Sequence, residues 1–108
     1  MGVGLCTVYN STISGNIGGY GGGAGGCTLY NSILINNQAN YDGGGANSCT
    51  FFNCFIANNT GMGGGGMYCA FYNCTITDNS MGLIGCTVRN SISWGNHTSD
   101  DFDMFGGS

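Results

Sequence analysis

The 108 residues contain no proline, no lysine and no glutamate, and Arg89 is the only arginine. With five aspartates the formal net charge is −4. A chain with one strongly basic side chain cannot neutralise phosphates, so nucleic acid is excluded as a partner, as is electrostatic binding to an anionic membrane. No apolar run is long enough to cross a bilayer, so we expect no membrane insertion.

Glycine, by contrast, is abundant, with 23 residues, and 42% of the chain is hydrophobic. High glycine with little charge can indicate disorder. Disordered segments are poor in aromatic and β-branched residues, however, and here both kinds are frequent and recur in register. The composition therefore favours a folded chain.

An eleven-residue frame occurs five times, first as CTVYNSTISGN, and always has Cys first, Asn fifth and Asn last. The frames start at residues 6, 27, 49, 69 and 86, so the steps are 21, 22, 20 and 17 residues. Only the glycine-rich connector changes in length. A period near twenty residues with insertions in one place is typical of a solenoid, and the glycine runs argue against helical repeats.

Within one frame the apolar residues do not follow a single period of two. Val8 and Ile13 can both point inward only if the chain bends near Asn10. We therefore predict an all-β fold, a right-handed parallel β-helix of about five coils with 17–22 residues per coil. It forms a single domain over 1–108, in which 97–108 is a C-terminal cap or leads into a further strand.

Stacking the coils in register predicts columns of identical residues, the ladders of the structure. One inward column is Cys6, Cys27, Cys49, Cys69 and Cys86. Two columns of asparagine are expected at corners, where Asn tolerates left-handed backbone and where its amide can bond to the coil above. They are Asn10, Asn31, Asn53, Asn73 and Asn90, and Asn16, Asn37, Asn59, Asn79 and Asn96. The alternative is that these asparagines bind sugars or ions.

The seven cysteines predict buried thiols that act as small hydrophobic groups. Neighbours in a column would have Cα atoms about 4.8 Å apart, within disulfide range, but parallel side chains point the same way. Cys54–Cys74 is the candidate disulfide. Zinc is not expected, because one column offers no tetrahedral arrangement. The weak candidate for calcium is the cluster Asp100, Asp101 and Asp103, and a solvated tail is the alternative.

Catalytic residues are not evident, and we predict neither an enzyme nor a cofactor. Glycoside hydrolysis needs two carboxylates about 5–9.5 Å apart. Asp42 and Asp78 each lack an obvious second carboxylate, and Arg89 stands alone.

The outward columns are unusually apolar, and they form the candidate interface. Its residues are Tyr9, Tyr30, Phe52, Tyr72, Ile33, Phe55 and Trp94. This surface would contact another protein or carbohydrate, unless the connectors fold over it.

The frame resembles the right-handed parallel β-helix repeats of bacterial cell-surface proteins. The segment 73–79, NCTITDN, fits their N-C-T-I-x-x-N phrase. Gly22-Gly23-Ala24 and Gly44-Gly45-Ala46, with the F-x-x-N match at 55–58, resemble polymorphic outer-membrane proteins and adhesins. The resemblance implies a β-helix at an extracellular or cell-surface location, and it implies little about function because these motifs are scaffold.

We therefore expect a non-enzymatic extracellular structural protein. Since no N-terminal cap is evident, its uncapped coils would join head to tail into a fibril or surface filament. One alternative is an adhesin fragment that binds glycans through the aromatic column, which consists of the outward residues Tyr9, Tyr30, Phe52 and Tyr72. A less favoured one is an ice-binding solenoid, suggested by the outward threonines Thr7, Thr28, Thr50 and Thr87.

Overall fold

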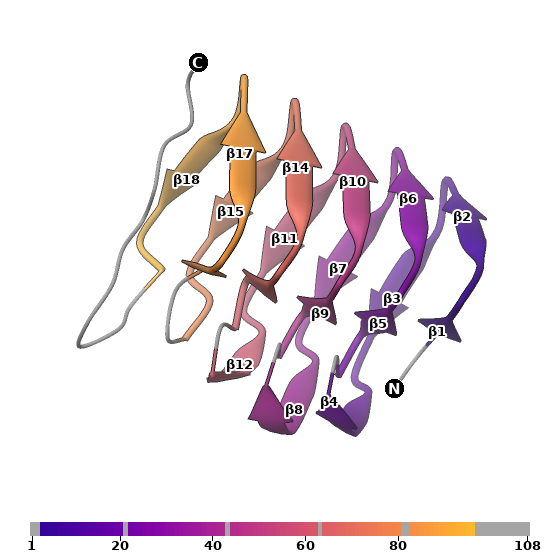
Figure 1. The fold of residues 1–108 in the computed structure, drawn as a ribbon, viewed down its shortest axis with the longest axis vertical. Helices are drawn as coiled ribbons and strands as arrows, with labels where there is room; N and C mark the ends of the chain where they lie inside the picture. The colour runs from indigo at the N-terminus through magenta and orange to yellow at the C-terminus, as the bar shows by residue number, and fades with distance from the viewer. Residues whose placement is uncertain (1–2, 21, 43, 63, 81–82, 97–108) are drawn as a thin grey trace.

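Strands are the only regular elements in the part of the chain that the structure describes, and they stack as a parallel β-solenoid (Figure 1). The computed structural model describes residues 3–20, 22–42, 44–62, 64–80 and 83–96. The predicted fold class is confirmed. Across these ranges no helix is long and apolar enough to span a membrane.

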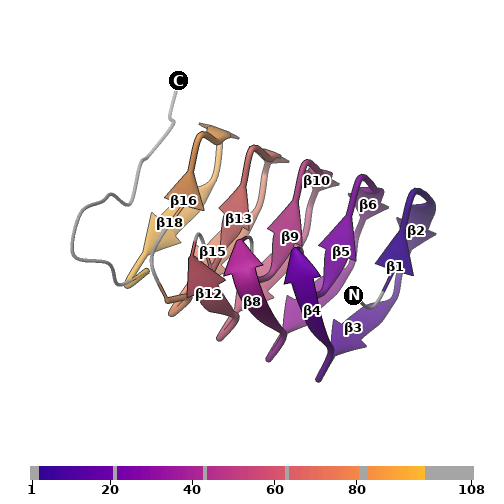
Figure 2. The ribbon, with the colours of Figure 1, turned by 60° about the horizontal axis from the view of Figure 1, so that its bottom comes forward.

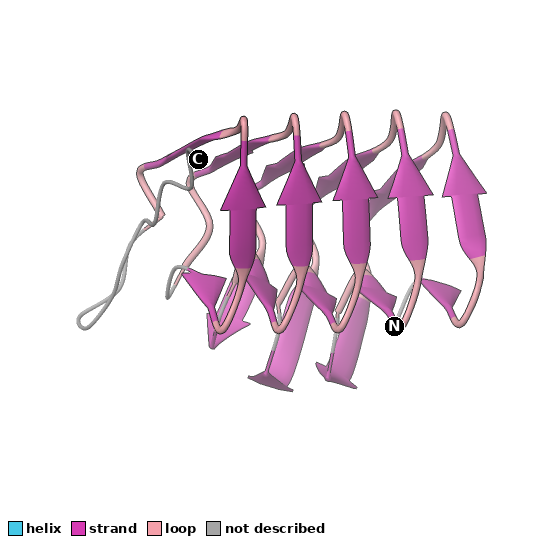
Figure 3. Ribbon diagram, turned by 45° about the horizontal axis from the view of Figure 1, so that its top comes forward, coloured by secondary structure: helices cyan, strands magenta, loops and turns pink. Residues whose placement is uncertain are grey.

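Three five-stranded parallel sheets run the length of the solenoid (Figure 3). The first consists of β1 (Val3–Gly4), β5 (Ala24–Gly25), β9 (Ala46–Asn47), β13 (Gly66–Met67) and β16 (Leu83–Ile84). The second consists of β2 (Thr7–Tyr9), β6 (Thr28–Tyr30), β10 (Thr50–Phe52), β14 (Ala70–Tyr72) and β17 (Thr87–Arg89). The third consists of β3 (Thr12–Ser14), β7 (Ile33–Ile35), β11 (Phe55–Ala57), β15 (Thr75–Thr77) and β18 (Ile92–Trp94).

A fourth, three-stranded sheet is built from the connectors (Figure 2). Its strands are β4 (Ile17–Tyr20), β8 (Gln38–Asp42) and β12 (Thr60–Met62). The solenoid thus has five layers, each holding one frame, but it makes about four turns. The predicted count of about five coils is slightly too high, because five stacked layers are joined by only four complete turns.

The strands of the frame pair residue for residue. Val8 lies beside Leu29, Leu29 beside Phe51, and the column continues through Phe71 to Val88. This register follows from the alternation of side chains along a strand, since a slip of one residue would turn every inward side chain outward.

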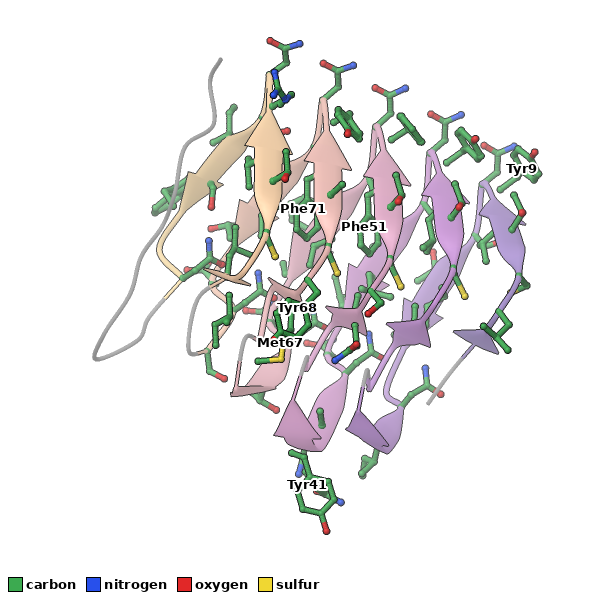
Figure 4. All side chains as sticks on the ribbon, in the orientation of Figure 1. Tyr9, Tyr41, Phe51, Met67, Tyr68 and Phe71 are labelled. Carbon is green, nitrogen blue, oxygen red and sulfur yellow. The ribbon has the colours of Figure 1, made fainter. Side chains whose placement is uncertain are left out.

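The core is the space between the sheets, filled by the middle residue of each three-residue strand of the second and third sheets, by the buried cysteines and by Ala24, Ala46 and Leu83 of the first sheet. Phe51 and Phe71 are fully buried and stack at 4.9 Å between ring centroids, and Figure 4 shows both rings inside the solenoid. The other inward residues of these strands are Val8, Leu29, Val88, Ile13, Leu34, Ile56, Ile76 and Ser93. Serine ends the second of these columns, at a site with no exposed surface.

The corners of each frame are formed by residues with left-handed backbone. The bend predicted at Asn10 is present, with φ of 50°, and the whole column from Asn10 to Asn90 shares it. A second corner, however, lies at Gly15, Asn36, Asn58, Asp78 and Gly95, and a third at Leu5, Gly26, Ser48, Tyr68 and Gly85. The prediction that both asparagine columns adopt the corner conformation is therefore wrong for the column that starts at Asn16, which comes one residue later.

Candidate functional site

A common rule describes the residue after a left-handed corner. Its side chain turns inward and, at every step of the asparagine column and at several steps of the other two columns, accepts a backbone N–H of the layer before it. In the asparagine column the N–H of Asn16 donates to Oδ1 of Asn37 at 3.1 Å, and that of Asn37 donates to Oδ1 of Asn59 at 2.9 Å. The Nδ2 groups donate to the same oxygens, at 3.1 and 3.0 Å. The ladder continues through Asn79 to Asn96.

This amide ladder is internal, because Asn37, Asn59 and Asn79 are at most 1% exposed. The asparagines of the other column, from Asn10 to Asn90, are exposed. Their contribution is the left-handed corner, which Asn adopts at lower cost than most residues. The two asparagine columns therefore have different roles. The column that starts at Asn16 forms the internal amide ladder, and the column that starts at Asn10 forms exposed corners.

Sulfur plays the acceptor role in the cysteine column. The N–H of Cys27 donates to Sγ of Cys49, and that of Cys49 to Sγ of Cys69, both at 3.4 Å. Each of these thiols also points to a carbonyl two residues earlier in the chain, as Cys49 does to Asn47 at 3.4 Å. Cys27, Cys49 and Cys69 are buried, Cys86 is half-buried and Cys6 is exposed.

The column that begins at Ser11 mixes serine and cysteine. The N–H of Cys54 donates to Sγ of Cys74 at 3.4 Å, and that of Cys74 donates to Oγ of Ser91 at 2.9 Å. All seven thiols are free, so the predicted Cys54–Cys74 disulfide is not formed. The physical reason is the parallel register, which points both side chains in the same direction and engages each sulfur with backbone.

The pKa values of the Cys54 and Cys74 thiols are shifted in opposite directions. A hydrogen bond from Cys74 lowers the pKa of Cys54 to about 7, despite burial, which acts in the opposite direction. The same hydrogen bond, followed by burial, raises the pKa of Cys74. A proton is therefore held more tightly by Cys74 than by Cys54.

The acceptor rule predicts how position 74 responds to substitution. Cys74→Ser should change the free energy of unfolding by less than about 1 kcal/mol, since Ser91 already fills that role for the next N–H. Cys74→Ala should cost about 1–3 kcal/mol, because the N–H of Cys54 loses its acceptor. Urea denaturation of the two variants tests this, and equal losses would show that the sulfur is only a space-filling group.

The ladders are directional, which makes the two ends of the stack different. Side chains accept from the layer before, so the inward acceptors of the first layer, Cys6, Ser11 and Asn16, have no donor layer among the described residues. In the later layers, the N–H of the first residue of each frame strand donates to a carbonyl of the preceding layer, as that of Thr28 does to Cys6 and that of Ile33 to Ser11. Thr7 and Thr12 are the corresponding residues of the first layer. Within the described ranges, the first layer therefore presents one face whose backbone N–H groups and side-chain acceptors are not paired with a further layer.

Burial also changes at the first layer. Cys6 is exposed whereas Cys27 below it is 3% exposed, Leu5 is 89% exposed and Tyr9 is 61% exposed. Figure 4 shows Tyr9 at the outer corner of this layer. No charged side chain lies in β2 or β3. An uncharged, open edge of this kind is the usual template for strand addition.

The aromatic column forms a continuous stack along the second sheet. The ring centroids from Tyr9 to Tyr30, Phe52 and Tyr72 are 5.1, 5.0 and 5.1 Å apart, and the planes are within 14° of parallel. Arg89 takes the next place in the register. The ring faces are thus in contact with one another, and mainly ring edges are left for a ligand.

Beside this column, the outward residues of the third sheet remain accessible. Ile33 and Phe55 are each 40% exposed and Trp94 is 59% exposed. The alternative that the connectors cover the apolar surface is therefore wrong for these positions. The connector strands instead form their own sheet.

The acidic residues give little support to a polar site. Asp78 is exposed at a left-handed corner. No group of three or more His, Cys, Asp or Glu side chains that could hold a metal ion occurs within the described ranges. The predicted calcium candidate, Asp100, Asp101 and Asp103, lies outside them, as does the segment predicted to be a cap or a further strand.

Comparisons with protein-family models, with curated proteins and with solved structures found no match.

Proposed function

We propose that this chain is a non-enzymatic structural subunit that assembles head to tail into a fibril or surface filament. The observation that carries the proposal is the direction of the ladders. Every inner layer donates N–H groups to the side chains of the next layer and accepts from the layer before. Two ends related in this way are complementary to each other and not to themselves.

The last layer supplies what the first layer lacks. Cys86 and Ser91 correspond to Cys27 and Cys74, whose N–H groups donate to a side chain of the next layer. No such next layer is present among the described residues for the N–H groups of Cys86 and Ser91. Placed above Cys6 and Ser11 of a second copy, they would continue both columns. A head-to-tail contact of this type does not close on itself, so it builds a fibre.

An extracellular or cell-surface location is part of the same proposal. It is supported by the resemblance of the frame to bacterial surface β-helices and by the low charge of the chain. The glycan-binding alternative has less support from the geometry, because sugars pack on ring faces and those from Tyr9 to Tyr72 stack on each other. Loss of glycan-array binding in Tyr30→Ala and Tyr72→Ala would favour it.

Assembly can be blocked at the first layer without removing a hydrogen bond inside the subunit. Thr7 and Thr12 are the first residues of β2 and β3, and their N–H groups face the open edge. Proline is tolerated at the first residue of an edge strand, where it removes a donor and obstructs pairing. We expect the double variant Thr7→Pro, Thr12→Pro to fold but to give no filaments in electron microscopy and to sediment as a monomer.

The matched control is Thr7→Val, Thr12→Val, which keeps both N–H groups and should assemble as the unchanged chain does. Circular dichroism establishes that both variants are folded. Monodisperse single particles of the unchanged chain at high concentration would refute the proposal. Filaments of the proline variant would show that growth does not use this edge.

A further inference from the structure

The thiols of Cys6 and Cys27 form a pair at the open end of the cysteine column. Their sulfurs are 3.7 Å apart and both are unoxidised. Cys6 is exposed, so a small solute can reach the pair from the first layer, whereas Cys27 is 3% exposed. The pair therefore combines a solvent-accessible sulfur with a fixed, buried one.

The geometry of a column selects the kind of ion that such a pair can hold. With no group of three or more ligand side chains in the described part of the chain, a tetrahedral zinc site is not offered. Two thiolates suit soft monovalent ions such as Cu(I), for which sulfur is the preferred ligand. Two bonds of about 2.3 Å, the length of a zinc–thiolate bond, add up to nearly the ladder spacing of about 4.8 Å.

We propose that Cys6 and Cys27 bind one soft monovalent metal ion, Cu(I) or Ag(I), with one sulfur on each side of it. The two sulfurs must separate from 3.7 Å toward the ladder spacing, and the exposed Cys6 side chain can make that movement. The site is open where no second copy covers the first layer, so the proposal concerns the unassembled chain and does not need head-to-tail assembly.

Binding converts two thiols and one metal cation into a complex with charge −1 and two released protons. No electron is transferred, and the metal enters as the monovalent ion. The S–H of Cys27 that points to the carbonyl of Gly25 at 3.3 Å is one of the protons lost. Burial, and then the Cys6 thiol, raise the pKa of Cys27, so deprotonation opposes binding. Because two protons are released on binding, the apparent affinity should fall about a hundredfold for each unit that the pH is lowered while both thiols are protonated.

The experiment is a competition for silver(I). The reduced, full-length chain is incubated with silver nitrate and millimolar glutathione, which withdraws silver from isolated thiols, and is then separated by gel filtration. We expect one silver ion bound at this site and a rise in melting temperature, because the ion binds the folded chain. X-ray absorption should find two sulfur neighbours around silver.

Cys6→Ser is the test variant, since the position is exposed and the substitution leaves the core unchanged. It should lose that silver ion. Cys54→Ser is the matched control and should retain it, because serine already stands in that column at 11, 32 and 91. Silver retained by Cys6→Ser, absence of silver from the unchanged chain, three or more sulfur neighbours, or a lower melting temperature would each overturn the proposal.

Discussion

Replacing Asn59 with alanine is expected to lower the free energy of unfolding by about 3–5 kcal/mol, because it leaves buried donors without acceptors. Oδ1 of Asn59 accepts from both the backbone N–H and Nδ2 of Asn37, at 2.9 and 3.0 Å. Its Nδ2 donates to the carbonyl of Leu34 and to Oδ1 of Asn79. The site has no exposed surface, so water cannot replace these partners.

Asn53→Ala is the matched control for this prediction. Asn53 lies in the same layer but is exposed, and its backbone is left-handed, with φ of 56°. Alanine there should cost only the left-handed penalty of about 1–2 kcal/mol. Urea denaturation followed by circular dichroism measures both variants. Equal losses would mean that the amide ladder adds nothing beyond the corner itself.

The repeat predicted the stacking correctly because a strand fixes its register through alternate side chains. Val8, Leu29 and Phe51 are in one column in the sequence and in the structure. The bend at Asn10 followed from the same reasoning, since Val8 and Ile13 cannot both be inward on one straight strand. These features depend on local geometry that one frame already contains.

The corners were harder to predict because different residues occupy them. Leu5, Ser48 and Tyr68 are left-handed, although none is a usual residue for that conformation. The missed signal is the spacing of five between Cys6, Ser11 and Asn16, which are the inward acceptors after three successive corners. Cysteine, serine and asparagine look unrelated in a sequence, but each offers one acceptor on a short side chain.

The same rule connects the fold with the proposed assembly. A ladder in which each layer donates to the next has no internal reason to stop at a given layer. The count of layers is then set by the chain and not by the geometry, unlike a closed barrel, which has no edge. The exposed Cys6 and Leu5 at the first layer are consistent with an edge that the frame itself does not close.

Replacing Gly64 with alanine is expected to cost at least about 3 kcal/mol, or to prevent folding, because the added methyl group would meet backbone that cannot move aside. A Cβ at this position would overlap the carbonyl oxygen of Ser80 and lie 2.6 Å from that of Asn59. The N–H of Gly64 also donates to Ser80 at 2.7 Å, and its carbonyl accepts from Gly45. Any shift that relieves the clash therefore disturbs hydrogen bonds to two neighbouring layers.

Gly15→Ala separates this steric effect from the general cost of replacing glycine. Gly15 has φ of 71°, and a methyl group added there would meet no atom of the described residues within 4 Å. Alanine at this position should therefore lose only about 1–2 kcal/mol for left-handed backbone. Each kcal/mol lost should lower the melting temperature by about 4–8 °C. The total fall in melting temperature should therefore be larger for Gly64→Ala than for Gly15→Ala. Similar melting temperatures for the two variants would contradict the interpretation that glycine is needed in the connectors so that the backbones of successive layers can approach closely.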